Sequence, residues 1–332
     1  MTAPLRTWLA PLTPIYRLGL ALRESRLASG KEPVRRLHFP VVSIGNLSTG
    51  GAGKTPLTIA LARSLSERGL RVDVLSRGYG RQYDAPARVR PDGTAVEFGD
   101  EPLLIARATG LPVFVAPQRY DAGLLAESDP GGAALHLLDD GFQHRQLHRD
   151  VDILLVNRAD WSDRLLPAGN LREPIHVARR ATVVAIPADE SRLSDDLRTW
   201  GWRGPIWPIK RLMEVPPISG AVGAFCGIAH PDQFFAGLEH AGLRVAVRTA
   251  FRDHHGFTVG DLDRLRASAR SAGAVALVTT EKDLVRLGRL ADSFPPTLPL
   301  TTVRLRAEIE DETQAVHWLL HRLNIPLGHT AL

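Results

Sequence analysis

The sequence predicts an α/β fold built on a mostly parallel sheet, and three features of the chain lead to this prediction. From residue 39 onward, short apolar segments typical of buried strands alternate with segments of helical periodicity. The first strand, 40–44, runs into a glycine-rich loop and then into a helix. Near residue 205 the amino-acid composition changes, because 204–223 is rich in Pro and Gly. We therefore expect a large α/β unit followed by a smaller one, with the boundary within about ten residues of 205.

Six apolar segments are expected to form strands, and each is short and rich in β-branched or leucyl residues. In chain order they are 40–44, 71–75, 134–138, 151–156, 182–186 and 274–278. The helix after the first strand carries Leu57, Leu61 and Leu65 on one face and stops at Gly69. Strands that alternate with helices indicate a parallel sheet covered on both faces.

Composition narrows the class of protein. With 332 residues, 44% of them apolar and 23% charged, the chain is an ordinary globular protein with a large core. The single cysteine, Cys226, excludes an internal disulfide framework and a Cys-based zinc site. No run approaches the ~20 apolar residues that span a bilayer, and the N-terminus lacks a secretory signal. We expect the protein to stay on the cytoplasmic side.

The N-terminal segment is basic and amphipathic. Residues 1–40 carry seven Lys or Arg against two Glu, which equals the whole net charge of +5. Thr13 is a suitable N-cap, and Ile15, Leu18 and Leu22 follow at helical spacing. Such a helix packs on the protein's own core or lies in the plane of a membrane. The charge favours an anionic partner, either phospholipid or nucleic acid.

The glycine-rich loop is the strongest chemical signal. Glycines let the backbone curl around phosphates with its N–H groups inward, at the positive end of the following helix. A Lys then reaches the β- and γ-phosphates, and a Thr hydroxyl ligates Mg²⁺. The loop departs from G-x-x-x-x-G-K-[ST] only at its first position. Its residues are Ser48, Thr49, Gly50, Gly51, Ala52, Gly53, Lys54 and Thr55.

An acidic pair after a later strand could supply the carboxylates that hold Mg²⁺ in such a site. Asp139 and Asp140 follow the buried strand 134–138, at the sheet edge where ligands bind in open α/β sheets. An enzyme with this loop needs an acid to hold Mg²⁺, directly or through water. Together with the glycine loop, the pair therefore predicts a metal site rather than a turn.

Other polar clusters are weaker signals. Asp100-Glu101-Pro102 opens a helix, where acids compensate the helix dipole. Asp253-His254-His255 lies in a loop and could supply one partner of an Asp–His proton-accepting pair. The segment from Arg77 through Tyr79 to Arg81 could embrace an anionic or sugar-like ligand, or form an ordinary turn.

These blocks together resemble the tetraacyldisaccharide 4′-kinase family of the lipid A pathway. The resemblance runs in family order from about residue 8 to 290, and the Ser48 departure is normal for this family. The residues that carry it are Ser43-Ile44-Gly45-Asn46-Leu47-Ser48 with the glycine loop, Ser76-Arg77-Gly78-Tyr79-Gly80-Arg81, Gly99-Asp100-Glu101-Pro102, Asp139-Asp140-Gly141-Phe142-Gln143-His144, Leu171-Arg172-Glu173-Pro174, Asp253-His254-His255 and Thr280-Glu281-Lys282-Asp283.

The resemblance implies a P-loop NTPase-like core over 39–205, a smaller α/β C-terminal or lid region over 206–332 and an N-terminal amphipathic membrane-docking segment, 1–38. It implies ATP- and Mg²⁺-dependent phosphorylation of the 4′-hydroxyl of tetraacyldisaccharide 1-phosphate, giving the bisphosphorylated precursor lipid IVA. The reaction would take place at the cytoplasmic face of the inner membrane. A lipid substrate makes membrane docking the favoured interpretation of the N-terminal helix.

The resemblance also implies roles for individual residues. Asp100 is the expected catalytic carboxylate and His254 its partner, with His255 as the alternative histidine. Lys54 and Thr55 serve the triphosphate and Mg²⁺, and Asp139 and Asp140 the metal. Candidates for substrate contact or for organising the site are Arg77, Tyr79, Arg119, Gln143, His144, Asn170 and Arg172.

Two rival interpretations remain at this point. A GTPase or ATPase of the metallochaperone or protein-targeting type shares the glycine loop, but Thr280-Glu281-Lys282-Asp283 lacks the spacing of a guanine-reading element. A nucleic-acid-binding protein is disfavoured because the basic arm is short and the remainder near neutral. We expect a lipid substrate and an anionic membrane surface as partners, without nucleic acid or an obligate protein partner.

Overall fold

The computed structural model describes residues 3–51 and 53–326. Its helices alternate with strands as the sequence predicts. The α-helices are α1 (Thr13–Ala28), α2 (Lys54–Glu67), α3 (Ala95–Phe98), α4 (Asp100–Thr109), α5 (Arg119–Glu127), α6 (Arg158–Ser162), α7 (Ser191–Thr199), α8 (Pro231–His240), α9 (Val259–Ser271), α10 (Glu281–Leu287) and α11 (Glu312–Arg322). The described residues also form three 3₁₀ helices, η1 (Ala3–Leu12), η2 (Ile175–Arg180) and η3 (Gly288–Ser293).

The strands of the described chain form one 12-stranded sheet in the order β10-β9-β11-β12-β8-β7-β6-β1-β5-β2-β4-β3. Only the β12–β8 and β4–β3 pairs are antiparallel, so the mostly parallel α/β sheet is confirmed. The strands are β1 (Val41–Asn46), β2 (Val72–Ser76), β3 (Ala87–Arg88), β4 (Val113–Val115), β5 (Leu135–Asp139), β6 (Val151–Leu155), β7 (Val183–Pro187), β8 (Ile206–Glu214), β9 (Ala221–Cys226), β10 (Arg244–Ala250), β11 (Ala276–Thr280) and β12 (Leu300–Ile309).

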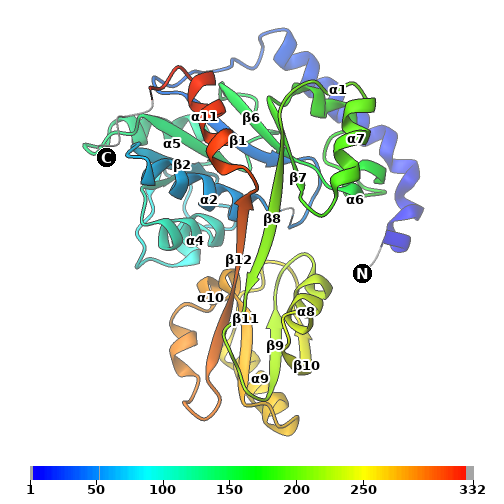
Figure 1. The fold of residues 1–332 in the computed structure, drawn as a ribbon, viewed down its shortest axis with the longest axis vertical. Coiled ribbons are helices and arrows are strands. Elements are labelled where there is room, and N and C mark those ends of the chain that lie inside the picture. Colours follow the sequence, from blue (N-terminus) through cyan, green and yellow to red (C-terminus); the bar gives the residue numbers. More distant parts are fainter. Residues whose placement is uncertain (1–2, 52, 327–332) are drawn as a thin grey trace.

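The molecule has two lobes joined by two long strands (Figure 1). β8 pairs with β7 at its start and with β12 along its later half, while the first part of β12 pairs with β11. We call residues 215–303 the smaller lobe and the rest of the described chain the larger lobe. The proline- and glycine-rich stretch near 205 therefore contains a nine-residue strand, β8.

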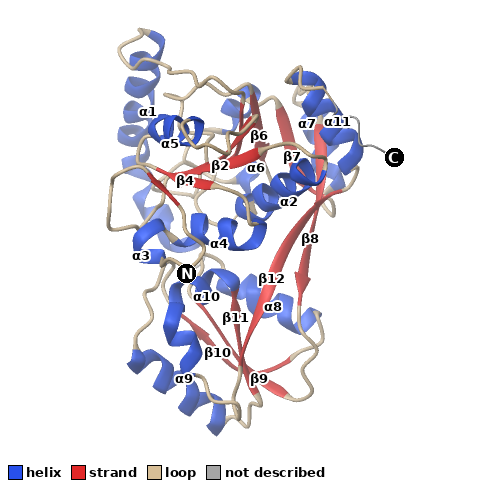
Figure 2. Cartoon of the chain, turned by 90° about the vertical axis from the view of Figure 1, so that its left-hand side faces the viewer, coloured by secondary structure: helices blue, strands red, loops and turns tan. Residues whose placement is uncertain are grey.

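Chain order does not follow the lobes. After β12 the chain returns to the larger lobe, where Val316 and Leu319 of α11 join the apolar cluster under α2 and α4. Figures 1 and 2 both show α11 beside the larger lobe's strands. The expected boundary between 205 and 206 stays a prediction.

Two apolar layers enclose the sheet of the larger lobe. Leu57 and Leu61 of α2 and Leu103 of α4 are fully buried on one face. Helix α7 covers the opposite face, and Tyr16 and Leu20 of α1 pack against the same cluster.

Helix α1 begins at Thr13, but the prediction that Thr13 caps it is wrong. The N-cap is Leu12, without a side-chain cap, because η1 continues directly into α1. No residue of α1 is fully buried, and Ile15, Leu18 and Leu22 are 57–68% exposed. These three side chains form an apolar stripe on α1 that faces away from the protein core. No helix in the described residues is long and apolar enough to cross a membrane.

Candidate functional site

The glycine loop lies between β1 and α2, and two of its glycines have backbone conformations that favour glycine. Gly50 has φ +112° and Gly53 has φ +90°, in the region that side chains with a Cβ rarely adopt. Gly53 is the N-cap residue of α2, so the first free N–H groups of that helix face the loop. Ala52, predicted as part of the loop, lies outside the described residues.

Lys54 is buried and bound at its tip. Its Nζ donates to Oδ1 of Asn46 at 3.0 Å and lies 3.5 Å from Oδ1 of Asp140. Asn46 is fully buried at the end of β1. The structure therefore brings the predicted lysine and one predicted carboxylate together, and adds Asn46 as a residue that sequence reasoning did not single out.

Asp139 ends β5 beside β1, with Ile44 as its register partner. Its Oδ1 accepts a hydrogen bond from Thr58 at 3.1 Å, while its buried Oδ2 has no partner among the described residues. Burial, with the negative charges of Glu101 and Asp140, raises the pKa of Asp139 to about 7. A buried carboxylate oxygen that has no partner and lies near the glycine-rich loop has the chemistry expected of an Mg²⁺ ligand.

Asp140 differs from Asp139 because cations surround it. Arg172 donates to both of its carboxylate oxygens, at 3.1 and 3.2 Å. Burial acts to raise the pKa of Asp140, but Lys54 and Arg172 outweigh it and lower that pKa. Its φ of +50° is uncommon for a residue with a Cβ, and such strain is concentrated at functional sites.

Mg²⁺ in phosphate sites usually takes one or two carboxylates and completes its shell with phosphate and water. Accordingly, the described residues contain no group of three or more His, Cys, Asp or Glu side chains that could hold a metal. Asp139 and Thr55, two of the residues expected to serve the metal, are both buried.

Asp100 and His254 meet across the two lobes. Nδ1 of His254 lies 3.0 Å from Oδ2 of Asp100. The neighbouring histidine points elsewhere, since Nε2 of His255 lies 3.1 Å from Oδ2 of Asp261. The geometry thus pairs His254, not His255, with the expected catalytic carboxylate.

The charges of this pair are stabilised by its surroundings. Burial acts to raise the pKa of Asp100, but the hydrogen bond from His254 and the charge of Arg286 hold that pKa well below its usual range. The hydrogen bond to Asp100 raises the pKa of His254. The ring of Tyr79 lies 5.1 Å from the His254 ring and is 59% exposed, which offers a flat face beside the pair.

A basic cluster surrounds His144. Arg119 is 8% exposed, and its Nε and the Nε2 of His144 have no partner among the described residues. Burial lowers the pKa of His144 to about 3, with further lowering from Arg119, Arg149, Arg23 and Arg77. Burial likewise lowers the pKa of Arg119 to about 10. Unpartnered buried donors among several cations suit an anionic ligand.

Gln143, Arg172 and Asn170 contact the protein itself. Gln143 donates to the backbone oxygen of Asn46 at 2.8 Å, and Arg172 donates to Oε1 of Gln143 at 3.3 Å. Asn170 donates through Nδ2 to Asp163 at 2.9 Å, and its carbonyl accepts from the Thr49 N–H at 2.8 Å. These contacts support their interpretation as residues that organise the site.

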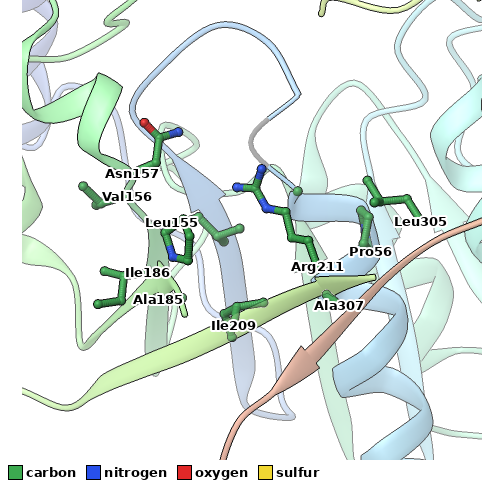
Figure 3. A pocket seen from close by; sticks show the side chains of 12 residues that line it. Pro56, Leu155, Val156, Asn157, Ala185, Ile186, Ile209, Arg211, Leu305 and Ala307 are labelled. Carbon is green, nitrogen blue, oxygen red and sulfur yellow. The ribbon is translucent and has the colours of Figure 1, made fainter. Parts of the chain in front are cut away.

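A small apolar pocket adjoins the glycine loop at the carboxyl ends of β6 and β7 (Figure 3). Arg211 of β8 points from its rim toward the loop, where its Nε lies 3.4 Å from the place of a Cβ on Gly53. The lining residues that Figure 3 labels are Pro56, Leu155, Val156, Asn157, Ala185, Ile186, Ile209, Arg211, Leu305 and Ala307.

A family model described as "Tetraacyldisaccharide-1-P 4'-kinase" matches residues 5–324. The chain belongs to the tetraacyldisaccharide 4′-kinase family. The rival GTPase or ATPase class of metallochaperone or protein-targeting type is accordingly not favoured.

Relatives of the family agree over nearly the whole chain. A tetraacyldisaccharide 4′-kinase of Koribacter versatilis is 39% identical, covering 92% of this chain and 96% of that protein. One of Chromobacterium violaceum is 36% identical, covering 96% and 94%. The crystal structure of LpxK from Aquifex aeolicus in complex with ATP aligns with a TM-score of 0.74 and 31% identity, over 96% of this chain and 99% of that one.

Proposed function

We propose that this chain transfers the γ-phosphate of ATP to the 4′-hydroxyl of tetraacyldisaccharide 1-phosphate. The observation that carries the proposal is the Asp100–His254 hydrogen bond of 3.0 Å in a chain that also carries the glycine loop. In the transfer, the hydroxyl oxygen bonds to the γ-phosphorus, the bond from that phosphorus to the β-phosphate oxygen breaks, and the hydroxyl proton passes to Asp100. ADP and a bisphosphorylated lipid are the products.

The residues divide this work in a way that suits phosphoryl transfer, which depends on alignment and charge stabilisation. The ATP complex of the Aquifex aeolicus relative supports ATP as the nucleotide. We assign the triphosphate to Lys54 and the N-terminus of α2. Asp100 receives the hydroxyl proton, and His254 orients the carboxylate.

We propose Mg²⁺ as the metal of the reaction, held by Thr55 and Asp139, with Asp140 beside them. When bound, the ion neutralises phosphate charge. The unpartnered Oδ2 of Asp139 supports this placement. Asp140 keeps Lys54 in place through their 3.5 Å ion pair.

The basic cluster of Arg77, Arg119 and His144 is proposed to bind the anionic group of the lipid. An arginine fork recognises phosphate in a bidentate manner, and the free Nε of Arg119 leaves one such donor available. Tyr79 offers its ring face to the sugar beside His254.

We propose peripheral binding to the cytoplasmic face of the inner membrane through α1. Its outward stripe of Ile15, Leu18 and Leu22 continues to Trp8, which is 73% exposed. Leucyl and aromatic groups enter the boundary between headgroups and acyl chains, while flanking arginines contact lipid phosphates.

One incubation tests the activity. The protein is mixed with ATP, Mg²⁺ and tetraacyldisaccharide 1-phosphate, and the lipid fraction is analysed for a second phosphate. Asp100→Asn keeps the size of the side chain but removes the proton acceptor, so we expect turnover to fall by about 10²–10⁴-fold. ATP hydrolysis that is indifferent to the lipid, or full activity of Asp100→Asn, would contradict the proposal.

A further inference from the structure

Arg286 of α10 reaches across the lobes to the same carboxylate as His254. Its Nε donates to Oδ2 of Asp100 at 2.7 Å, and its Nη2 lies 2.5 Å from the same oxygen. Both side chains are only 5% exposed. A charge-assisted contact of this kind, shielded from water, is stronger and more directional than a surface ion pair.

Arg286 is itself held in place by a buried carboxylate on the side away from Asp100. Its Nη1 donates to Oδ1 of Asp283 at 3.0 Å, and Asp283 is fully buried. Asp283 in turn accepts from the Thr280 hydroxyl at 2.7 Å and from the Gly227 N–H at 3.1 Å. The guanidinium is therefore fixed in orientation by β11, α10 and the loop after β9.

The two oxygens of Asp100 have different surroundings. Oδ2 takes the contacts from His254 and from Nε and Nη2 of Arg286. Oδ1 accepts the backbone N–H of Glu101 at 2.9 Å. Since a carboxylate oxygen has two lone pairs, Oδ1 keeps capacity for one further donor.

We propose that Arg286 is a positioning residue for phosphoryl transfer, which holds Oδ2 of Asp100 so that Oδ1 faces the acceptor hydroxyl. The inference rests on the proposed function. The proton of the hydroxyl passes to Oδ1 as the oxygen bonds to the γ-phosphorus, while Oδ2 stays bound to Arg286 and His254. Alignment to a fraction of an ångström is what such a residue supplies, and its loss costs about 10²-fold in rate.

Lys282, the neighbouring cation of α10, does not serve this role. Its Nζ donates to Oε1 of Glu101 at 2.5 Å rather than to Asp100. Asp253 in the His254 loop lies 3.9 Å from Arg286 and carries a negative charge, so it cannot replace the arginine. Arg286 is thus the cation that contacts the Asp100 carboxylate directly.

Removing Arg286 also has an electrostatic consequence that a merely structural role lacks. The groups that face Asp100 are His254 and Asp253 from the loop, Arg286, Lys282 and Asp283 from α10, and Glu101 and Tyr79. Without the Arg286 charge, the pKa of Asp100 rises, because burial raises this pKa and one of the positive charges that lower it is then missing. The acid limb of kcat should therefore move to higher pH.

The test compares Arg286→Met with Arg286→Lys and with a matched control. Arg266→Met removes an Arg–Asp pair of the same i,i+3 spacing and the same 3.0 Å length within the smaller lobe. Each variant is assayed for kcat and KM with both substrates between pH 3 and 9, a range that reaches below the ordinary pKa of an aspartate. Binding of a fluorescent ATP analogue and circular dichroism are measured in parallel.

We expect Arg286→Met to lose about 10²-fold in kcat, with its acid limb at higher pH and its affinity for the ATP analogue within threefold of wild type. Arg286→Lys keeps the charge and should retain the wild-type acid limb and a kcat within tenfold. Arg266→Met should match wild type.

Three results overturn the inference: a kcat of Arg286→Met within threefold of wild type, a loss confined to KM, or an unchanged acid limb. If Arg286→Met does not fold, the pH profile of Arg286→Lys decides, and a shifted acid limb in this charge-conserving variant would refute the assignment. A wild-type protein that phosphorylates no lipid would refute the proposed function instead, before any variant is compared.

Discussion

Gly45, the fifth residue of β1, allows the strand that leads into the glycine loop to pass very close to the turn after Asp140. A methyl group at this position would lie 2.5 Å from Cβ and 2.8 Å from the backbone nitrogen of Phe142. Non-bonded carbon atoms prefer about 3.5–4.0 Å. We therefore predict that Gly45→Ala destabilises the protein and displaces the site at the same time.

The magnitude follows from what would have to move. Phe142 is 1% exposed and belongs to the apolar cluster that α7 covers. Its backbone cannot yield without moving Asp140, two residues before it. Overpacking a rigid site costs about 1–3 kcal/mol, and we expect about 3 kcal/mol because backbone atoms take part. That corresponds to roughly a 100-fold change in the folding equilibrium.

Urea denaturation of wild type and Gly45→Ala measures this loss as a lower midpoint at unchanged slope. Gly19→Ala in α1 is the matched control, because the added methyl group meets no atom of the described residues within 4 Å outside its chain neighbours and the helix's own backbone. In a helix this change should be stabilising by about 0.5–1 kcal/mol. A loss below about 0.5 kcal/mol for Gly45→Ala would refute the steric argument.

Three further changes test the remaining assignments. Lys54→Met should weaken binding of a fluorescent ATP analogue at least tenfold, since the charged hydrogen bonds of Lys54 are worth about 1.5–3 kcal/mol. Leu18→Glu should lower co-sedimentation with anionic vesicles about tenfold, because the lipid then buries one leucine fewer. Ser25→Glu adds the same charge without that loss. Burial acts to lower the pKa of His136, but its hydrogen bond with Asp73 outweighs this and raises that pKa above 6.5. Its stabilising contribution is complete below about pH 6.5 and falls as pH rises through the folded pKa, so urea midpoints at pH 6 and 8 should differ less in His136→Gln than in wild type.

The sequence alone was sufficient to place a site residue where its motif directly follows a recognisable strand. Lys54 and Asp139 could be placed together because a glycine loop and an acidic pair both follow apolar strands, and the carboxyl ends of parallel strands share one edge. The register confirms this placement, with Ile44 of β1 opposite Asp139 of β5. The expected strands at 151–156 and 182–186 are β6 and β7, which differ from the prediction by one residue at their ends.

Contacts between distant segments could not be predicted in this way. Arg286 lies 186 residues from Asp100 and belongs to α10, whose spacing carries no sign of a partner in α4. Its only sequence signal was its place three residues after Asp283, which ends the block Thr280-Glu281-Lys282-Asp283 that carries part of the family resemblance. Likewise, the Pro and Gly of 204–223 suggested a domain boundary and gave no sign of β8. That strand forms because β7 and β12 supply its hydrogen-bond partners.

The N-terminal helix connects the membrane proposal with the site. Tyr16 donates through its hydroxyl to the backbone oxygen of Arg172 at 2.8 Å, and Arg23 donates to the backbone oxygen of Gln143. Arg172 binds Asp140, and Gln143 binds the backbone of Asn46, whose side chain holds Lys54. A short chain of contacts thus joins the inward side of α1 to Lys54, while the leucine stripe of the helix faces out. If the stripe enters the lipid surface, the height of the site above the membrane is fixed by this docking rather than by a flexible tether, which is what a substrate anchored by four acyl chains requires.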